Sequence, residues 1–190
     1  MKTAILGGSY NPVHLGHLAL GRAVHEAGYD CVLFIPASCP PHKTLAGGAQ
    51  DMDRVAMLEL ALENHPWAQV WDGELRRSGF SYTFDTIVQL KKEGLVTGRP
   101  GLVIGDDLAP GFRNWYQVDH LLTEVDILLA RREEEQDVPV DFPCHRLKNP
   151  LWPHSSTAIR HAIALGAGLE DYLPLNVAQY IQERGLYGRG

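Results

Sequence analysis

The first strand-to-helix connection of this chain reads Gly7-Gly8-Ser9-Tyr10-Asn11-Pro12-Val13-His14-Leu15-Gly16-His17. It follows a short apolar run at residues 3–6, which predicts a buried strand, and it precedes residues 18–27, where apolar side chains recur at helical spacing. A strand, a glycine-containing turn and a first helical turn form an anion site, because backbone N–H groups and the positive end of the helix dipole point at it. The sequence therefore predicts that an anion binds at this turn.

Two common nucleotide-binding patterns are absent from this turn. Gly7 and Gly8 are adjacent and the next glycine is Gly16, so the spacing G-x-G-x-x-G is not met. No Gly-Lys-Ser/Thr follows, which excludes the P-loop pattern. His14 and His17 lie on either side of Gly16 and add ring N–H donors that neither pattern carries. A tight turn with two chance histidines is the alternative interpretation.

The turn resembles a known signature. Gly8-Ser9-Tyr10-Asn11-Pro12, followed by His14-Leu15-Gly16-His17, is similar to the HxGH signature of the nucleotidyltransferase superfamily, whose members transfer a nucleotidyl group from a nucleoside triphosphate and release pyrophosphate. The resemblance implies that His14 and His17 are catalytic. It further implies ATP contacts from Gly8, Ser9, Tyr10 and Gly16. This chain has Tyr10-Asn11 where Phe-Asp is usual, and we expect Asn11 to cap the helix ahead of Pro12.

Composition narrows the class of protein. The 190 residues fit one α/β domain, 1–190, with a full hydrophobic core. The net charge of −6 gives no indication of nucleic acid or an anionic membrane as a partner. Three widely spaced cysteines (Cys31, Cys39 and Cys144) argue against a disulfide framework and a zinc site. With no signal peptide and no apolar run long enough to cross a bilayer, we expect a cytoplasmic protein.

Continuous apolar runs predict a parallel sheet. Residues 31–36, 101–104 and 125–130 have the character of buried strands. The order strand, helix, strand within the first three dozen residues implies a right-handed crossover and parallel pairing. We expect an α/β fold with a doubly wound parallel sheet, Rossmann-like. Because ligands in such sheets bind beyond the carboxyl ends of the strands, the residues after each strand are the candidates for chemistry.

The segment after the second strand contains Pro40-Pro41-His42-Lys43. Its prolines disfavour a helix and leave His42 and Lys43 on an exposed loop. The four residues match the corresponding loop of the nicotinate and nicotinamide mononucleotide adenylyltransferases. The resemblance implies that Lys43 contacts triphosphate oxygens.

Residues 74–86 carry a longer match to the bacterial pyridine-nucleotide branch of the superfamily. Glu74-Leu75-Arg76-Arg77 leads to Ser81-Tyr82-Thr83-Phe84-Asp85-Thr86 at the start of a predicted helix. Taken alone, the hydroxyl side chains there fit ordinary helix caps. The resemblance implies that Ser81, Tyr82 and Thr83 bind the mononucleotide.

Acidic, aromatic and basic side chains follow the next two predicted strands. The family's Gly-x-Asp corresponds to Gly105 and Asp107 and implies a place near the ATP ribose. Eight residues after Asp107 is Trp115, which we expect on a loop among polar neighbours, and the resemblance implies that it stacks on the pyridine ring beside Tyr116.

Arginines follow the strand predicted at residues 125–130. Arg131 or Arg132 suits a phosphate, because a guanidinium donates two parallel hydrogen bonds. We assign Arg132 to the mononucleotide and leave Arg131 as the alternative. Where the family continues Arg-Pro-Gly, this chain has Glu133-Glu134-Glu135.

A second anion site is predicted near residue 155. His154-Ser155-Ser156-Thr157-Ala158-Ile159-Arg160 places hydroxyl groups at the start of a helix and Arg160 one turn later. Ser-Ser-Thr-x-Ile-Arg resembles the second superfamily signature, with His154 in place of an apolar residue. The resemblance implies ATP contacts from Ser156 and Thr157 and a catalytic Arg160, so that the helices from about 155 complete the site. It extends from Gly7 to Tyr187.

The resemblance implies transfer of AMP from ATP to nicotinate mononucleotide, which gives deamido-NAD and pyrophosphate in NAD biosynthesis. Mg²⁺ would enter with ATP, bound mainly by phosphates and water. Adenylyl transfer to nicotinamide mononucleotide or to phosphopantetheine is the nearest alternative, and a nucleotide-binding regulator without catalysis is another. A metal site built from His14, His17 and His42 is a third, and a homo-oligomer is left open.

Overall fold

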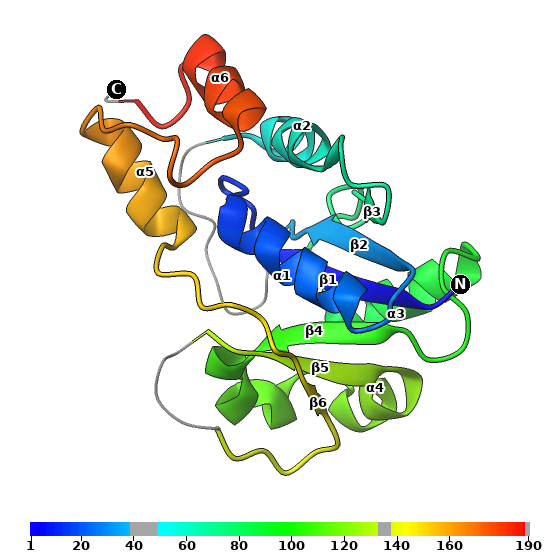
Figure 1. The fold of residues 1–190 in the computed structure, drawn as a ribbon. Coiled ribbons are helices and arrows are strands. Elements are labelled where there is room, and N and C mark those ends of the chain that lie inside the picture. Colours follow the sequence, from blue (N-terminus) through cyan, green and yellow to red (C-terminus); the bar gives the residue numbers. More distant parts are fainter. Residues whose placement is uncertain (39–48, 133–137, 189–190) are drawn as a thin grey trace.

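The molecule is built around a parallel β-sheet (Figure 1). The structure, a computed structural model, describes residues 1–38, 49–132 and 138–188. Within these ranges six strands pair in parallel in the order β3-β2-β1-β4-β5-β6. Their bounds are Thr3–Gly8 for β1, Cys31–Pro36 for β2, Ala68–Val70 for β3, Gly101–Gly105 for β4, Asp126–Ala130 for β5 and His145–Arg146 for β6.

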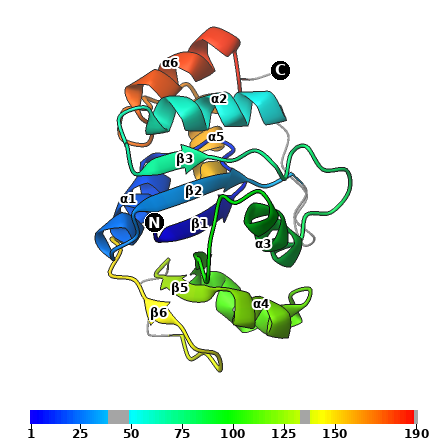
Figure 2. The same cartoon turned by 90° about the vertical axis from the view of Figure 1, so that its right-hand side faces the viewer.

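Helices cover both faces of the sheet (Figure 2). Alternate residues of β1 point to opposite faces, so Ala4 and Leu6 pack in one apolar cluster and Ile5 in the other. The first cluster contains residues of α1, α2, α5 and α6, and the second contains residues of α3, η1 and α4. The helix bounds are Leu15–Glu26 for α1, Asp51–Leu62 for α2, Thr83–Lys92 for α3, Asp106–Asn114 for the 3₁₀ helix η1, Val118–Glu124 for α4, Ser156–Ala164 for α5 and Leu175–Arg184 for α6.

The strand order places the site. From β1 the chain adds β2 and β3 on one side and then returns to add β4, β5 and β6 on the other. The order therefore reverses between β1 and β4, and in doubly wound sheets ligands bind at that point, beyond the carboxyl ends of the strands. The predicted doubly wound α/β fold is confirmed, with strands at each apolar run that indicated one.

One local expectation is wrong. Asn11 does not cap α1, since the cap residue is His14, whose extended backbone ends the turn one residue before Leu15. Residues 106–114 form the 3₁₀ helix η1, and Trp115 is the residue at its C-terminal cap, in the connection that leads to α4. Its indole packs on Phe112 with ring centroids 5.1 Å apart, at the margin of the second apolar cluster. Within the described residues no helix has the length and apolar character that a membrane crossing requires.

Candidate active site

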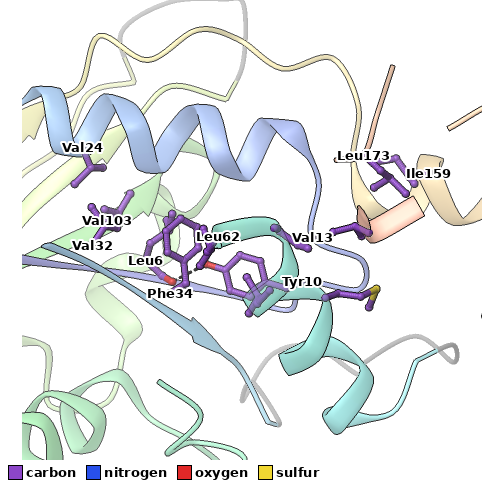
Figure 3. Packing of buried hydrophobic residues seen from close by; sticks show 14 of the residues in the cluster. Leu6, Tyr10, Val13, Val24, Val32, Phe34, Leu62, Val103, Ile159 and Leu173 are labelled. Atoms are coloured by element: carbon purple, nitrogen blue, oxygen red, sulfur yellow. Dashed lines mark hydrogen bonds between the residues drawn. The ribbon is translucent and has the colours of Figure 1, made fainter. Parts of the chain in front are cut away.

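Tyr10 anchors the β1–α1 turn, residues 9–14, to strand β1. Tyr10 is fully buried, and its hydroxyl donates a hydrogen bond to the carbonyl of Leu6 in β1 at 2.6 Å. Its backbone φ of 44° lies in the left-handed region, which is costly for a residue with a side chain and is found at functional turns. A Cβ on Gly8 would stand 3.0 Å from the Tyr10 ring. Figure 3 shows the ring packed beside Phe34 and Leu6.

The two signature histidines lie against each other. The rings of His14 and His17 stack with centroids 3.7 Å apart and planes 28° apart. The backbone N–H of His14 donates to Nδ1 of His17 at 3.2 Å. Nδ1 therefore accepts and carries no proton, so the proton of the neutral His17 ring is on Nε2. The rings of Tyr10 and His17 meet edge to face, with their centroids 4.8 Å apart. The arrangement prepares one N–H donor on His17 for an incoming acceptor.

Both histidines are neutral at physiological pH. Burial first, then the Arg132 charge and the nearby His154, lowers the pKa of His14 to about 4. Burial first, followed by His14 and Arg132, holds the pKa of His17 well below its ordinary value. His14 is 5% exposed, and its Nδ1 has no hydrogen-bond partner within the described ranges. A phosphate would favour the protonated rings, so binding of an anion would raise both pKa values.

The first turn of α1 is partly occupied by the chain itself. The N–H of Leu15 donates to the carbonyl of Tyr172 at 2.9 Å, so this amide is not open to a ligand. A Cβ on Gly16 would stand 2.4 Å from the indole of Trp152, which explains why only glycine fits between the two histidines here. The expectation that free N–H groups dominate this anion site is corrected to that extent.

The second signature meets the first at the β1–α1 turn, where α5 lies beside the start of α1 (Figure 1). The Ser156 hydroxyl donates to the Pro12 carbonyl at 3.0 Å. The Arg160 guanidinium donates to the Asn11 carbonyl at 2.7 Å and to the Thr157 hydroxyl at 3.1 Å. The structure therefore brings together segments that are more than 140 residues apart, around one turn.

The ends of β4 and β5 supply an acidic and a basic group. The backbone N–H of Arg132 donates to the buried Asp106 carboxylate at 3.0 Å. A Cβ on Gly105 would stand 2.1 Å from the Asp107 carboxylate and 2.7 Å from the Arg132 stem, so Gly105 allows both to approach. Arg132 lies close enough to lower both histidine pKa values. Asp107 itself is exposed. Sequence reasoning singled out Asp107 and missed Asp106, which holds Arg132 in place.

Arg131 is held differently from its neighbour. Its backbone N–H donates to Oδ1 of Asn149 at 2.9 Å, and its carbonyl accepts from Nδ2 of Asn149 at 2.8 Å. These two hydrogen bonds hold the backbone of Arg131 just after the end of β5. The electrostatic influence of Arg132 on the histidine pair favours Arg132 as the residue that faces the site.

Aromatic rings gather at the start of α3 and the end of η1. Tyr82 is the residue before α3, and its ring lies 4.6 Å from that of Tyr116, which is 47% exposed. Thr83 is the first residue of α3 and is half-buried. The Ser81 hydroxyl is buried without a partner in the described part of the chain. The structure brings Tyr82 and Tyr116 together and leaves Tyr116 partly exposed to solvent.

A chain of side-chain hydrogen bonds joins the segment before α3 to the first turn of that helix. Arg77 donates to the Thr86 hydroxyl at 2.5 Å, and the Thr86 hydroxyl donates to Glu74 at 2.6 Å. Burial raises the pKa of Glu74, against the opposing effects of Thr86 and Arg77. The Glu-Leu-x-Arg match therefore corresponds to a polar support under the start of α3.

A buried arginine also supports the site and was missed in the sequence. Arg54 is 1% exposed and donates to the carbonyls of Ser9 and Ala37, each at 2.8 Å. It joins the β1–α1 turn to the end of β2. Residues 54, 57, 58 and 61 recur at helical spacing and are all buried, so Arg54 lies on the buried face of α2.

Some predicted groups lie outside the described residues. These are Lys43, His42 and the run 133–135. Among the residues that the structure describes, no cluster of three or more His, Cys, Asp or Glu side chains is arranged to hold a metal ion.

Comparison with known proteins shows the family. A family model described as Cytidylyltransferase-like matches residues 5–162. A relative from Treponema pallidum, named "Probable nicotinate-nucleotide adenylyltransferase", is 40% identical, over 98% of this chain and 99% of its own length. A relative of the same name from Enterococcus faecalis is 36% identical, over 98% of this chain and 84% of its own length.

A solved structure shares the fold. The nicotinic acid mononucleotide adenylyltransferase of Plasmodium falciparum, complexed with NaAD, matches with a TM-score of 0.74 and 18% identity, over 98% of both chains. At that identity the likeness shows the fold alone, and it agrees with the doubly wound sheet. The family match and the full-length relatives together mean that this chain belongs to the cytidylyltransferase-like family, among the nicotinate-nucleotide adenylyltransferases.

Proposed function

We propose that this chain transfers AMP from ATP to nicotinate mononucleotide, giving deamido-NAD and pyrophosphate in NAD biosynthesis. One observation carries the proposal, which is the contact between the two signatures, where Arg160 donates to the Asn11 carbonyl beside the stacked His14–His17 pair. The names of the full-length relatives support the same reaction. We retain the cytoplasmic setting expected from the sequence.

The reaction is a direct displacement at phosphorus. A phosphate oxygen of the mononucleotide attacks the α-phosphorus of ATP, the bond to the bridging β-phosphate oxygen breaks, and pyrophosphate leaves with that electron pair. No covalent intermediate with the protein is needed, so catalysis consists of positioning and charge stabilisation.

The phosphate side of the site provides donors. Nε2–H of His17 donates to the α-phosphate as negative charge builds there, and His14 adds a second ring. Arg160 and Lys43 stabilise the pyrophosphate leaving group. Mg²⁺ arrives as part of the substrate MgATP, held mainly through phosphate oxygens and water. Backbone and side-chain contacts to ATP are assigned to Gly8, Ser9, Tyr10, Gly16, Gly105, Asp107, Ser156 and Thr157.

The other side receives the mononucleotide. Arg132 binds its phosphate, and Trp115 stacks on its pyridine ring. Ser81, Tyr82, Thr83 and Tyr116 complete the contacts. We assign the preference for a carboxylate over an amide to backbone N–H donors near Trp115 and Tyr116. An N–H group cannot accept a hydrogen bond, so the N–H groups of an amide would find no partner there.

The test is product identification. The protein is incubated with MgATP and, separately, with nicotinate mononucleotide, nicotinamide mononucleotide and phosphopantetheine, and each product is identified by mass. We expect a deamido-NAD product and a higher kcat/KM for the acid than for the amide. Product formed only from phosphopantetheine, or no pyrophosphate release with any acceptor, would overturn the proposal. Equal kcat/KM values for acid and amide would overturn the acid preference while leaving adenylyl transfer intact.

A further inference from the structure

A hydrogen bond joins the C-terminal segment to the β1–α1 turn. The hydroxyl of Tyr187, just after α6, donates to Oδ1 of Asn11 at 2.7 Å, across a separation of 176 residues. Asn11 is 3% exposed, so this bond is shielded from water. Burial raises the pKa of Tyr187 above its ordinary value, which keeps the hydroxyl protonated as a donor.

Asn11 also carries a predicted catalytic group. Its backbone carbonyl accepts the 2.7 Å hydrogen bond from Arg160, while its side-chain oxygen accepts from Tyr187. The direction of the Asn11 peptide therefore determines where the guanidinium is anchored. Asn11 has no charge, so its side chain accepts from Tyr187 without neutralising Arg160.

Helix α6, which ends three residues before Tyr187, is bonded to α2. The carboxylate of Asp53 in α2 accepts hydrogen bonds from Tyr180 at 3.0 Å and from Arg184 at 3.2 Å. The next residue, Arg54, donates to the Ser9 carbonyl of the same turn. One turn of α2 thus binds α6 on one side and the β1–α1 turn on the other.

We propose that Tyr187 is a positioning residue, which orients Arg160 for the triphosphate through the side chain and carbonyl of Asn11. This inference rests on the proposed function for the identity of the triphosphate. Tyr187 touches no substrate, and its effect passes through Arg160 alone.

Tyr187→Phe removes the hydroxyl and keeps the ring. We expect ATP to bind about 3–10-fold more weakly, the range that loss of one buried hydrogen bond produces. The value of kcat/KM for ATP should fall by the same factor, while KM for the mononucleotide is unchanged. Tyr180→Phe is the matched control, since it removes a tyrosine hydroxyl that bonds to Asp53 rather than to the turn, while Arg184 still bonds Asp53 to α6. We expect a similar loss of melting temperature and no change in ATP affinity.

The route through Arg160 is tested by a double mutant. In an Arg160→Ala background, Tyr187→Phe should weaken ATP binding by less than about 2-fold, because residues that act through one another are not additive. An unchanged ATP affinity in Tyr187→Phe, or the same factor in both backgrounds, would overturn the inference. If the wild-type protein binds ATP but forms no dinucleotide, the proposed function fails and the affinities still decide the role of Tyr187. Absence of ATP binding by the wild-type protein would overturn both.

Discussion

The two sides of the proposed site are built in opposite ways. On the phosphate side, formed by the β1–α1 turn and the starts of α1 and α5, partly buried polar groups bond across large separations in sequence. On the acceptor side, formed by the start of α3 and the end of η1, aromatic side chains reach solvent. Tyr116 is 47% exposed and Phe80 62%. The Ser81 hydroxyl and Arg77 Nε there are buried without partners in the described ranges.

This difference indicates a division of labour. Groups that must meet charge developing in a transition state are most effective when they are fixed before the reaction starts. Groups that recognise a flat ring act through contact area and can tolerate more freedom. We therefore expect substitutions on the phosphate side to lower kcat or stability, and substitutions on the acceptor side to raise the KM of the mononucleotide.

The largest effect should come from His17. His17→Ala removes the Nε2–H donor, and loss of one preorganised donor costs about 10²–10³ in rate. We expect kcat to fall by that factor with a much smaller change in the KM for ATP, measured by steady-state kinetics. His25→Ala, near the other end of α1, is the control and should keep kcat near the wild-type value. A kcat within a few-fold of wild type for His17→Ala would mean that His17 is only structural.

The second-largest expected effect is a loss of folding stability in acid. In the unfolded chain a histidine titrates near 6.5, whereas burial and Arg132 hold the pKa of His14 at about 4 in the fold. Between these values the unfolded state binds the additional proton, so stability falls as pH is lowered and levels off below about 4. The gap corresponds to about 3 kcal/mol.

Denaturant unfolding at several pH values measures this loss. His14→Asn should show a shallower fall between pH 6.5 and 4 than the wild type. Contributions from His65 and Asp53, whose pKa values are also lowered, are common to both proteins and cancel in the difference. The lowering of the His17 pKa by burial, its largest cause, is likewise common to both. Parallel curves for the two proteins would contradict the neutral, buried state of His14.

Local patterns were enough to predict the sheet and its signatures. Residues 31–36 are apolar without interruption because the strand is buried on both faces, and the structure has β2 over the same six residues. His14, Gly16 and His17 lie within one helical turn, so their resemblance to the HxGH signature can be recognised from neighbouring residues alone. The role of each site residue and the single-domain organisation stay predictions.

Contacts between distant segments were beyond sequence reasoning. The side-chain oxygen of Asn11, expected to cap a helix, instead accepts from Tyr187, because the C-terminal segment folds back onto the turn. Trp152 packs on Gly16 from a segment whose course no local pattern gives. Asp106 and Asp107 are adjacent and chemically alike, so only their directions show that Asp106 holds the Arg132 backbone.

A moderate effect is expected on the acceptor side. If the Trp115 indole stacks on the pyridine ring, Trp115→Ala should weaken mononucleotide binding by about 1–3 kcal/mol, the scale of stacking on nucleobases. Its packing on Phe112 gives the variant a second cost in stability. The KM for ATP should barely change, and a matched Trp67→Ala variant, at a ring that stacks on His25, should leave both KM values unchanged. Unchanged acceptor affinity in folded Trp115→Ala would mean that Trp115 serves only the core.

The smallest effect should come from Tyr10. The variant Tyr10→Phe distinguishes the contribution of the ring from that of the hydroxyl. Tyr10→Phe keeps the edge contact with His17 at 4.8 Å and removes only the hydrogen bond to the Leu6 carbonyl. A buried hydrogen bond of this kind contributes about 1 kcal/mol, so unfolding in denaturant should show a loss of that size. Because the ring still supports His17, we expect kcat to stay within about 2-fold of wild type. A large loss of kcat with little change in stability would show that the hydroxyl, through β1, positions the histidine pair. The phosphate side would then depend on single hydrogen bonds more strongly than its dense packing suggests.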